Sequence, residues 1–445
     1  MTGDTAARPQ KRGFALSDVW LIFGRRGSLK QLGILGALVV IIAIFQIWTG
    51  GTTLAPGNVI NIVQAYSFIL LLSVGMVMVI IAGHIDLSVG SVAAFVAIVV
   101  ATAMRDWELP WWGGVLLGIA LGAAIGAFQG FWVAYIGVPA FIVTLAGMLI
   151  WRGAQQYVGQ AQTVAVPAEF RQALYGFMPE VGPPTPYNNL TLLLGALVVA
   201  AIVFFQWRSR AKRKKLNAIL EPLWVTLTRT GILCAVVIYA TLLFGSGRVG
   251  TSFPISGIIL AVLIIFYAFL TSRTTLGRHI YAVGGNRRAA ELSGVHARRT
   301  DFFVMMNMST LAGVAGMLWA ARAGAAGPGD GTGWELDAIA GVFIGGAAVA
   351  GGIGTVFGSV IGGLVMAVLN NGLQLVGITT DRMQIIKGLV LLVAVGIDVL
   401  NKQQGRFSFI GIMLGRLRAT RAQQEVEEIS PGSQRPDPPG KSGPG

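Results

Sequence analysis

The sequence predicts an all-α protein, a polytopic bundle of about 10 to 12 transmembrane helices. Hydrophobic residues make up 54% of the chain and charged residues only 12%, whereas soluble proteins carry about 25% charged residues. Apolar runs close to the spanning length of about 20 residues recur from residue 32 onwards. Because a bilayer admits only helices or closed barrels, runs this continuous indicate helices.

The apolar runs divide the chain into a membrane domain and two polar ends. Residues 1–31 form an N-terminal segment, residues 32–402 the membrane domain, and residues 403–445 a polar, proline-rich tail that we expect to be largely disordered. The predicted spans are 32–48, 59–82, 88–104, 114–135, 139–152, 189–206, 231–246, 254–271, 301–320, 336–350, 355–376 and 384–400.

The formal charge of +14 is placed unevenly along the chain. Most of the 33 Lys and Arg residues fall in the segments 1–31, 207–230, 272–300 and 401–445. The positive-inside rule therefore predicts that these segments and both termini are cytoplasmic. The basic run at 208–215 resembles a nucleic-acid patch, but its place between two apolar spans favours an anchor beside anionic lipids, with no nucleic-acid partner.

Asp86 lies between two apolar spans, where an ionised carboxylate without partners is costly. One interpretation is an N-cap, because its side chain can accept the backbone N–H groups that follow it. The other places Asp86 and Ser88 on a substrate route, at a broken helix that exposes backbone polar groups. Both roles can coexist.

Uncharged amides recur inside the predicted spans. They both donate and accept hydrogen bonds, so they can replace the hydration of a hydroxyl-rich solute, and hydrogen bonding between helices explains them equally well. The candidates for the pathway are Asn61, Gln64, Asn307, Asn370 and Asn371. Glu335 and Asp337, at the start of another span, are interpreted as interfacial or capping residues.

Two further patterns concern glycines. Gly118, Gly122, Gly126 and Gly130 recur every four residues and predict one helix face that allows close packing. Residues 84–92 and 351–361 share the letters Gly-Ser-Val, a weak match that is compatible with an internal duplication.

The sequence contains no pattern for catalysis. It has neither the Gly-x-x-x-x-Gly-Lys-Ser/Thr phosphate loop nor the His-Glu-x-x-His metal pattern, and His84, His279 and His296 are scattered. We therefore expect no enzyme activity, no catalytic residue, no metal site and no cofactor on this chain.

The segment 272–300 is a long polar loop with signals for a short helix. Asn286 can cap it, Ala289, Ala290 and Ser293 give it a small-residue face, and Gly294 can end it. Such a helix suits docking into a groove of a partner, and a merely basic inner loop is the alternative.

Three stretches together resemble the branched-chain/ribose/xylose group of ABC permeases. They are Gly-His-Ile-Asp-Leu-Ser-Val-Gly-Ser (83–91), Gly-Arg-His-Ile-Tyr-Ala-Val-Gly-Gly-Asn (277–286) and Glu-Leu-Asp-Ala-Ile-Ala-Gly-Val-Phe-Ile-Gly-Gly (335–346). The resemblance spans about residues 55 to 402. Residues 139–149, the basic loop near 208–215 and the apolar span after it look most like xylose-type members. His84 stands where relatives often have Gly or an acid.

The resemblance implies the permease subunit of an ATP-driven monosaccharide importer in the bacterial inner membrane, with D-xylose or a related sugar as the solute. It implies a second permease copy, an ABC ATPase subunit that holds ATP and Mg, a periplasmic or extracellular sugar-binding protein and membrane lipids as partners. A proton-coupled secondary transporter is the alternative. The candidates for coupling to the ATPase are Gly284, Gly285, Asn286, Ala289, Ala290, Glu291, Ser293 and Gly294.

Overall fold

The computed structural model describes residues 28–183, 185–216, 222–246 and 252–403. The predicted N-terminal segment and tail fall almost wholly outside these residues. The chain divides into two compact units, Met1–Ala394 and Val395–Gly445. Of the second unit only residues 395–403, the last part of one helix, are described, and nearly all of the described helices belong to the first unit.

The described residues are mostly helical, with only two short strands among them, which confirms the predicted all-α bundle. The helices are α2 (Ser28–Trp48), α3 (Pro56–Ile81), α4 (Val89–Asp106), α5 (Trp111–Phe131), α6 (Ala140–Val158), α7 (Ala168–Tyr175), α8 (Asn189–Lys215), α9 (Leu223–Gly245), α10 (Ile255–Arg273), α11 (Thr275–Gly285), α12 (Arg287–Leu292), α13 (Ala297–Ala323), α14 (Trp334–Ile344), α15 (Val356–Leu375) and α16 (Thr380–Gln403). The short turns η2 (Thr52–Leu54) and η3 (Trp132–Ile136) and the antiparallel pair β1 (Val164–Ala165) and β2 (Ala325–Ala326) complete it.

Eight helices in the described part of the chain are long and apolar enough to cross a membrane. They are α3, α4, α5 with η3, α8, α9, α10, α13 and α15. Helices α2, α6 and α16, with 21, 19 and 24 residues, also reach the length of a span. A multi-pass bundle follows from these lengths.

Several predicted span boundaries are wrong, among them the start of α9, which lies at Leu223 rather than at residue 231. The expected span 336–350 is instead α14, which has 11 residues and ends at Ile344. At 1.5 Å per residue it rises about 16 Å, about half of a bilayer core. Gly346, Gly351 and Gly352 after it adopt positive φ angles of 85°, 81° and 72°, which a continuing helix does not allow. The basic run at 208–215, expected in a loop, forms the last turns of α8.

Helix α13 is the centre of the packing and contacts α3, α4 and α5. The glycine face of α5 lies against it: a Cβ at Gly122 would lie 2.7 Å from the Ser309 carbonyl oxygen, and one at Gly126 would lie 2.6 Å from Met306 Cα. The predicted close-packing role of these glycines is confirmed, because any side chain there would push the two helices apart.

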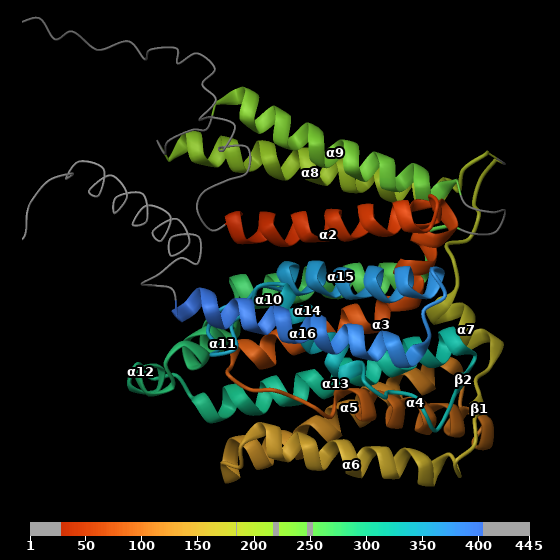
Figure 1. Cartoon of the computed structure of the whole chain (residues 1–445), viewed down its shortest axis with the longest axis vertical. Helices are drawn as coiled ribbons and strands as arrows, with labels where there is room; N and C mark the ends of the chain where they lie inside the picture. The colour runs from red at the N-terminus through yellow and green to blue at the C-terminus, as the bar shows by residue number, and fades with distance from the viewer. Residues whose placement is uncertain (1–27, 184, 217–221, 247–251, 404–445) are drawn as a thin grey trace, which may run out of the picture. The chain divides into compact units, whose positions relative to one another are not determined.

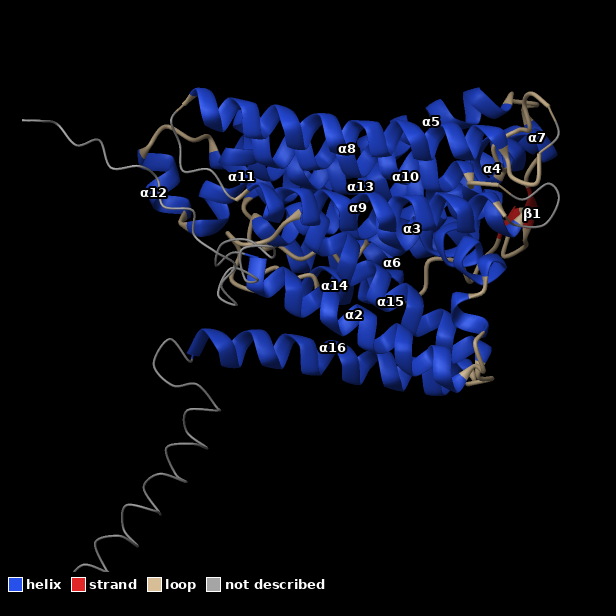
Figure 2. Ribbon diagram, turned by 90° about the horizontal axis from the view of Figure 1, so that it is seen from above, coloured by secondary structure: helices blue, strands red, loops and turns tan. Residues whose placement is uncertain are grey.

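Two sets of short elements mark opposite ends of the long helices. Helices α11 and α12 lie at one end, and α7 with β1 lies at the other, in both Figure 1 and Figure 2. Within this frame α4 lies toward the end that carries β1, and α14 toward the end that carries α11 (Figure 1).

Candidate functional site

Residues 82–88 form a non-helical connection between α3 and α4, and this connection is buried at Asp86 and Ser88. Both are 0% exposed. Asp86 Oδ1 accepts the Ser88 backbone N–H at 2.8 Å and the Ser88 hydroxyl at 2.7 Å. Gln129 of α5 donates its amide to the Ser88 oxygen at 3.0 Å. The chain therefore breaks its helical path inside the bundle and fixes the break with a carboxylate.

The second carboxylate oxygen, Asp86 Oδ2, is buried and has no hydrogen-bond partner among the residues that the structure describes. The capping interpretation explains Oδ1, since that oxygen holds a backbone N–H directly before α4. It leaves Oδ2 unexplained, and a buried carboxylate oxygen without a partner is costly. The hydrogen bonds between Asp86 and Ser88 are observed, whereas a role of these two residues on a substrate route stays a prediction.

The starts of α4 and α14 lie against each other. A Cβ at Gly90 would lie 2.2 Å from the Gly331 carbonyl oxygen and 2.5 Å from Glu335 Oε2. From this contact α4 and α14 extend toward different ends of the bundle (Figure 1). Helix N-termini carry partial positive charge, so Asp86 and Glu335 lie where negative charge is favoured. Paired ends of broken helices are typical of solute sites in membrane transporters.

Glu335 and Asp337 are more buried than the sequence suggested. They are 7% and 4% exposed, in the first turn of α14. Asp337 Oδ2 accepts Lys387 Nζ of α16 at 2.9 Å. Both acids line a cavity of about 300 Å³ between α14, α15 and α16. Both acids lie in the first turn of α14, as the capping interpretation predicted, but they are buried and therefore not interfacial. The sequence did not show this burial, because the residues of α15 and α16 that enclose the two acids are remote in sequence.

The candidate amides do not gather at one place. Gln64 donates to the Tyr175 carbonyl of α7 at 2.8 Å, Asn307 accepts from the Tyr267 hydroxyl of α10, and Asn371 exchanges hydrogen bonds with Asn58 at 2.9 and 3.0 Å. Asn61 is exposed, and Asn370 is buried. These contacts support the interhelical interpretation for Gln64, Asn307 and Asn371 in this conformation. Pathway lining remains a prediction.

Helix α12 has the local signals that the sequence predicted. Asn286 Oδ1 accepts the Ala289 N–H at 3.0 Å, and Gly294, with φ of 85°, ends the helix. Ala290 does not share an exposed face with Ala289 and Ser293, because it is 5% exposed and packs with Val283 and Ala297. Ala290 attaches the helix to α11 and α13.

The outward side of α12 is therefore different from the predicted small-residue face. Ala289 and Ser293 are exposed, as are Asn286, Glu291 and Gly294. Leu292 is 84% exposed, so the outward side of this helix also presents a large apolar side chain. Gly285 is exposed, whereas a Cβ at Gly284 would lie 1.6 Å from the Ile81 carbonyl oxygen. The candidates thus include outward residues and residues that hold α11 to α3.

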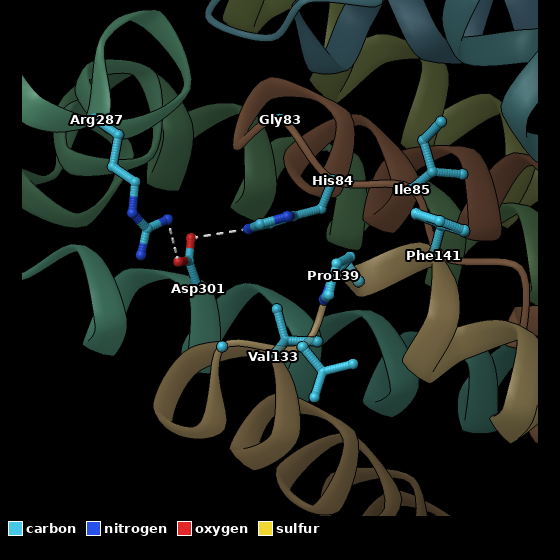
Figure 3. Close-up of a pocket in the computed structure, with 11 residues that line it drawn as sticks. Gly83, His84, Ile85, Val133, Pro139, Phe141, Arg287 and Asp301 are labelled. Carbon is cyan, nitrogen blue, oxygen red and sulfur yellow. Dashed lines mark hydrogen bonds and ion pairs between the residues drawn. The ribbon is translucent and has the colours of Figure 1, made fainter.

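A cavity of about 460 Å³ lies beside α12 (Figure 3). Its lining includes residues 83–85 of the broken connection, the turn at 137–141 and the side chains of Arg287 and Asp301. Arg287 Nη1 donates to Asp301 Oδ2 at 2.6 Å, and His84 Nε2 lies 3.0 Å from Asp301 Oδ1. Sequence reasoning missed this cluster because His84 and Asp301 are 217 positions apart.

A second contact joins α11 to the loop before α15. The Tyr281 hydroxyl donates to the Gly354 carbonyl at 2.7 Å. Burial raises the pKa of this hydroxyl above its usual value of 10.0, so it remains a neutral donor at pH 7.

Long apolar helices, two helix starts buried inside the bundle and a short capped helix at one end together define a multi-pass membrane transport protein. The comparisons with known proteins identify which kind. Residues 58–395 match the family model described as branched-chain amino acid transport system / permease component. The chain belongs to this family, so it is an inner-membrane transport permease rather than an enzyme.

Named relatives cover nearly the whole chain. The xylose transport system permease protein of Haemophilus influenzae is 38% identical over 377 residues, 85% of this chain and 98% of the relative. The xylose transport system permease protein of Escherichia coli K12 is 36% identical, covering 86% and 95%. The ribose import permease protein of E. coli K12 is 33% identical, covering 83% and 92%. No solved structure matches the chain.

Proposed function

We propose that this chain is the membrane subunit of an ATP-driven monosaccharide importer, with D-xylose or a related sugar as the solute. The observation that carries the proposal is α12, a capped helix whose outer side is exposed while its inner residue Ala290 is buried in the bundle. A helix held in this way is suited to transmit force from a docked partner. The printed names of the relatives, xylose and ribose permeases, supply the solute class.

The partners follow from this assignment. A cytoplasmic ATPase that holds ATP and Mg docks on α12, a sugar-binding protein delivers the solute at the opposite face, and a second copy of the chain completes the pathway. Both termini and the α11–α12 end are then cytoplasmic. The basic end of α8 lies on the same side, where anionic lipid headgroups attract it.

The solute passes the helix starts of α4 and α14. Carboxylate and amide groups replace the hydration of sugar hydroxyls without requiring a charged substrate. Asp86, whose Oδ2 has no hydrogen-bond partner within the described part of the chain, is placed to accept such a hydroxyl when the pathway opens. In alternating access the ATPases close on ATP, α12 moves, and the helices around these starts change their separation.

A proton-coupled secondary transporter is the second candidate, and one observation favours it. Asp86, Glu335 and Asp337 are at most 7% exposed, and Lys387 binds Asp337. Ionisable groups buried in this way are a property of proton relays. The exposed α12 has no role in such a mechanism.

Uptake of labelled D-xylose separates the two candidates. Cells carry this permease with its ATPase and binding protein, or with an ATPase that binds but does not hydrolyse ATP, and ribose and galactose serve as competing sugars. ATP-driven import predicts that uptake is lost with the inactive ATPase and persists with a proton uncoupler while ATP is maintained. Uptake that survives the inactive ATPase and collapses with the uncoupler would instead establish the secondary transporter.

A further inference from the structure

We infer that two side-chain linkages, Arg287–Asp301–His84 and Tyr281–Gly354, carry the movement of the α11–α12 segment to the starts of α4 and α15. This inference rests on the proposed function, in which α12 receives the force of a partner ATPase. The linkage residues are positioning residues, since none of them needs to touch the solute.

The first linkage begins on α12 and ends two residues before Asp86. Asp301 is 1% exposed and uses both carboxylate oxygens, one toward Arg287 at 2.6 Å and the other toward His84 at 3.0 Å. Figure 3 shows the Asp301 carboxylate between the side chains of Arg287 and His84, and His84 directly follows Gly83 in the non-helical connection. A buried carboxylate forms strong charge-assisted hydrogen bonds with its partners. When Arg287 moves, we therefore expect Asp301 to transmit the movement to His84.

The segment after His84 is in turn fixed to the bundle. Asp86 holds Ser88, and Ser88 is bound by Gln129 of α5. A pull on His84 therefore acts on the residues that set the start of α4. The cavity of about 460 Å³ borders the same connection, so there is room for residues 83–85 to move without first displacing packed side chains.

The second linkage begins on α11. The Tyr281 hydroxyl donates to the Gly354 carbonyl at 2.7 Å, and Thr355, the next residue, accepts the Gly358 N–H at 3.0 Å and so begins α15. The Gly352 N–H binds the Ile81 carbonyl at 2.8 Å, which ties this loop to the end of α3. The α11–α12 segment is thus connected by one side-chain linkage to the connection before α4 and by another to the loop before α15.

The test uses the complete complex in proteoliposomes, with labelled D-xylose and the binding protein. The variants are Asp301→Asn, His84→Gln, Arg287→Gln and Tyr281→Phe. Arg278→Gln is the control, since it removes an exposed charge from α11, outside the docking helix, and belongs to neither linkage. Three quantities are measured: ATPase that co-purifies with the permease, ATP hydrolysed, and sugar taken up.

We expect co-purification within about twofold of wild type and a fall of about fivefold in sugar taken up per ATP hydrolysed, for the linkage variants only. His84→Gln combined with Asp301→Asn should be no worse than Asp301→Asn, since both act on one linkage. Tyr281→Phe should lower the ratio further when added to Asp301→Asn. If the Asp301→Asn complex does not assemble, His84→Gln and Tyr281→Phe test the linkages instead. His84→Gln keeps the buried Asp301 carboxylate, and Tyr281→Phe keeps the aromatic ring.

Two failures are distinguishable. A wild-type complex that takes up no sugar with active ATPase refutes the proposed function. A wild-type complex that works, with an unchanged ratio in His84→Gln and Tyr281→Phe or an equal fall in Arg278→Gln, refutes the linkages alone.

Discussion

Substitution of Gly284 by alanine tests how tightly α11 is held to α3. The added Cβ would lie 1.6 Å from the Ile81 carbonyl oxygen and 2.9 Å from the Gly352 nitrogen, both backbone atoms. An ordinary contact needs about 3.4 Å, so the two backbones must separate by more than 1 Å, which breaks van der Waals contact along the segment. Overpacking of this kind costs about 1–3 kcal/mol.

Gly285→Ala is the matched control, because a Cβ there meets nothing within 4 Å. Alanine gains up to about 1 kcal/mol of helix propensity at an interior position, and comparing neighbouring residues largely removes this gain. We expect Gly284→Ala to lower the melting temperature of the detergent-solubilised permease by several degrees relative to Gly285→Ala, and to lower xylose uptake. Equal melting temperatures and equal uptake for the two variants would refute the backbone contact between α11 and α3.

Three further perturbations test other parts of the molecule. Asn286→Ala removes the cap of α12 and should weaken co-purification of the ATPase, at a cost of about 1 kcal/mol in helix stability; unchanged co-purification would contradict a docking role. Asp86→Asn should lower initial uptake about tenfold at equal membrane levels, as expected for one charge-assisted hydrogen bond worth about 1.5 kcal/mol, whereas normal uptake would leave Asp86 with its capping contact alone. Lys387→Gln strands the buried Asp337 carboxylate and should cost about 3 kcal/mol in thermal unfolding, and the double variant with Asp337→Asn should recover most of that loss; no recovery would argue against the pair.

The fold could be predicted well where the signal is local. Continuous apolar runs locate the long helices, because a bilayer requires every backbone group to bond within its own segment. The prediction failed at α14, where the apolar composition continues through residues 345–350 but the glycines turn the chain. Hydropathy averages over a window and does not detect a change of φ at one glycine.

The candidate site divides in the same way. Asn286 and Gly294 could be assigned from sequence because a cap acts over three or four residues. The burial of Ala290 results from packing against Val283 and Ala297 of neighbouring helices. The Asp301–His84 contact results from packing between segments 217 positions apart. Side chains of this kind show their roles only when the tertiary structure places them together.

The exposure of Leu292 also affects how the protein behaves in the laboratory. This large apolar side chain is 84% exposed on the helix that we propose as the ATPase dock, so it stays uncovered when the ATPase is absent. Permease purified without its ATPase should therefore self-associate as its concentration rises, and replacing this one side chain with serine should lessen the effect. Co-expression of both subunits before solubilisation would keep this side chain covered and yield better-behaved material for crystallisation or microscopy.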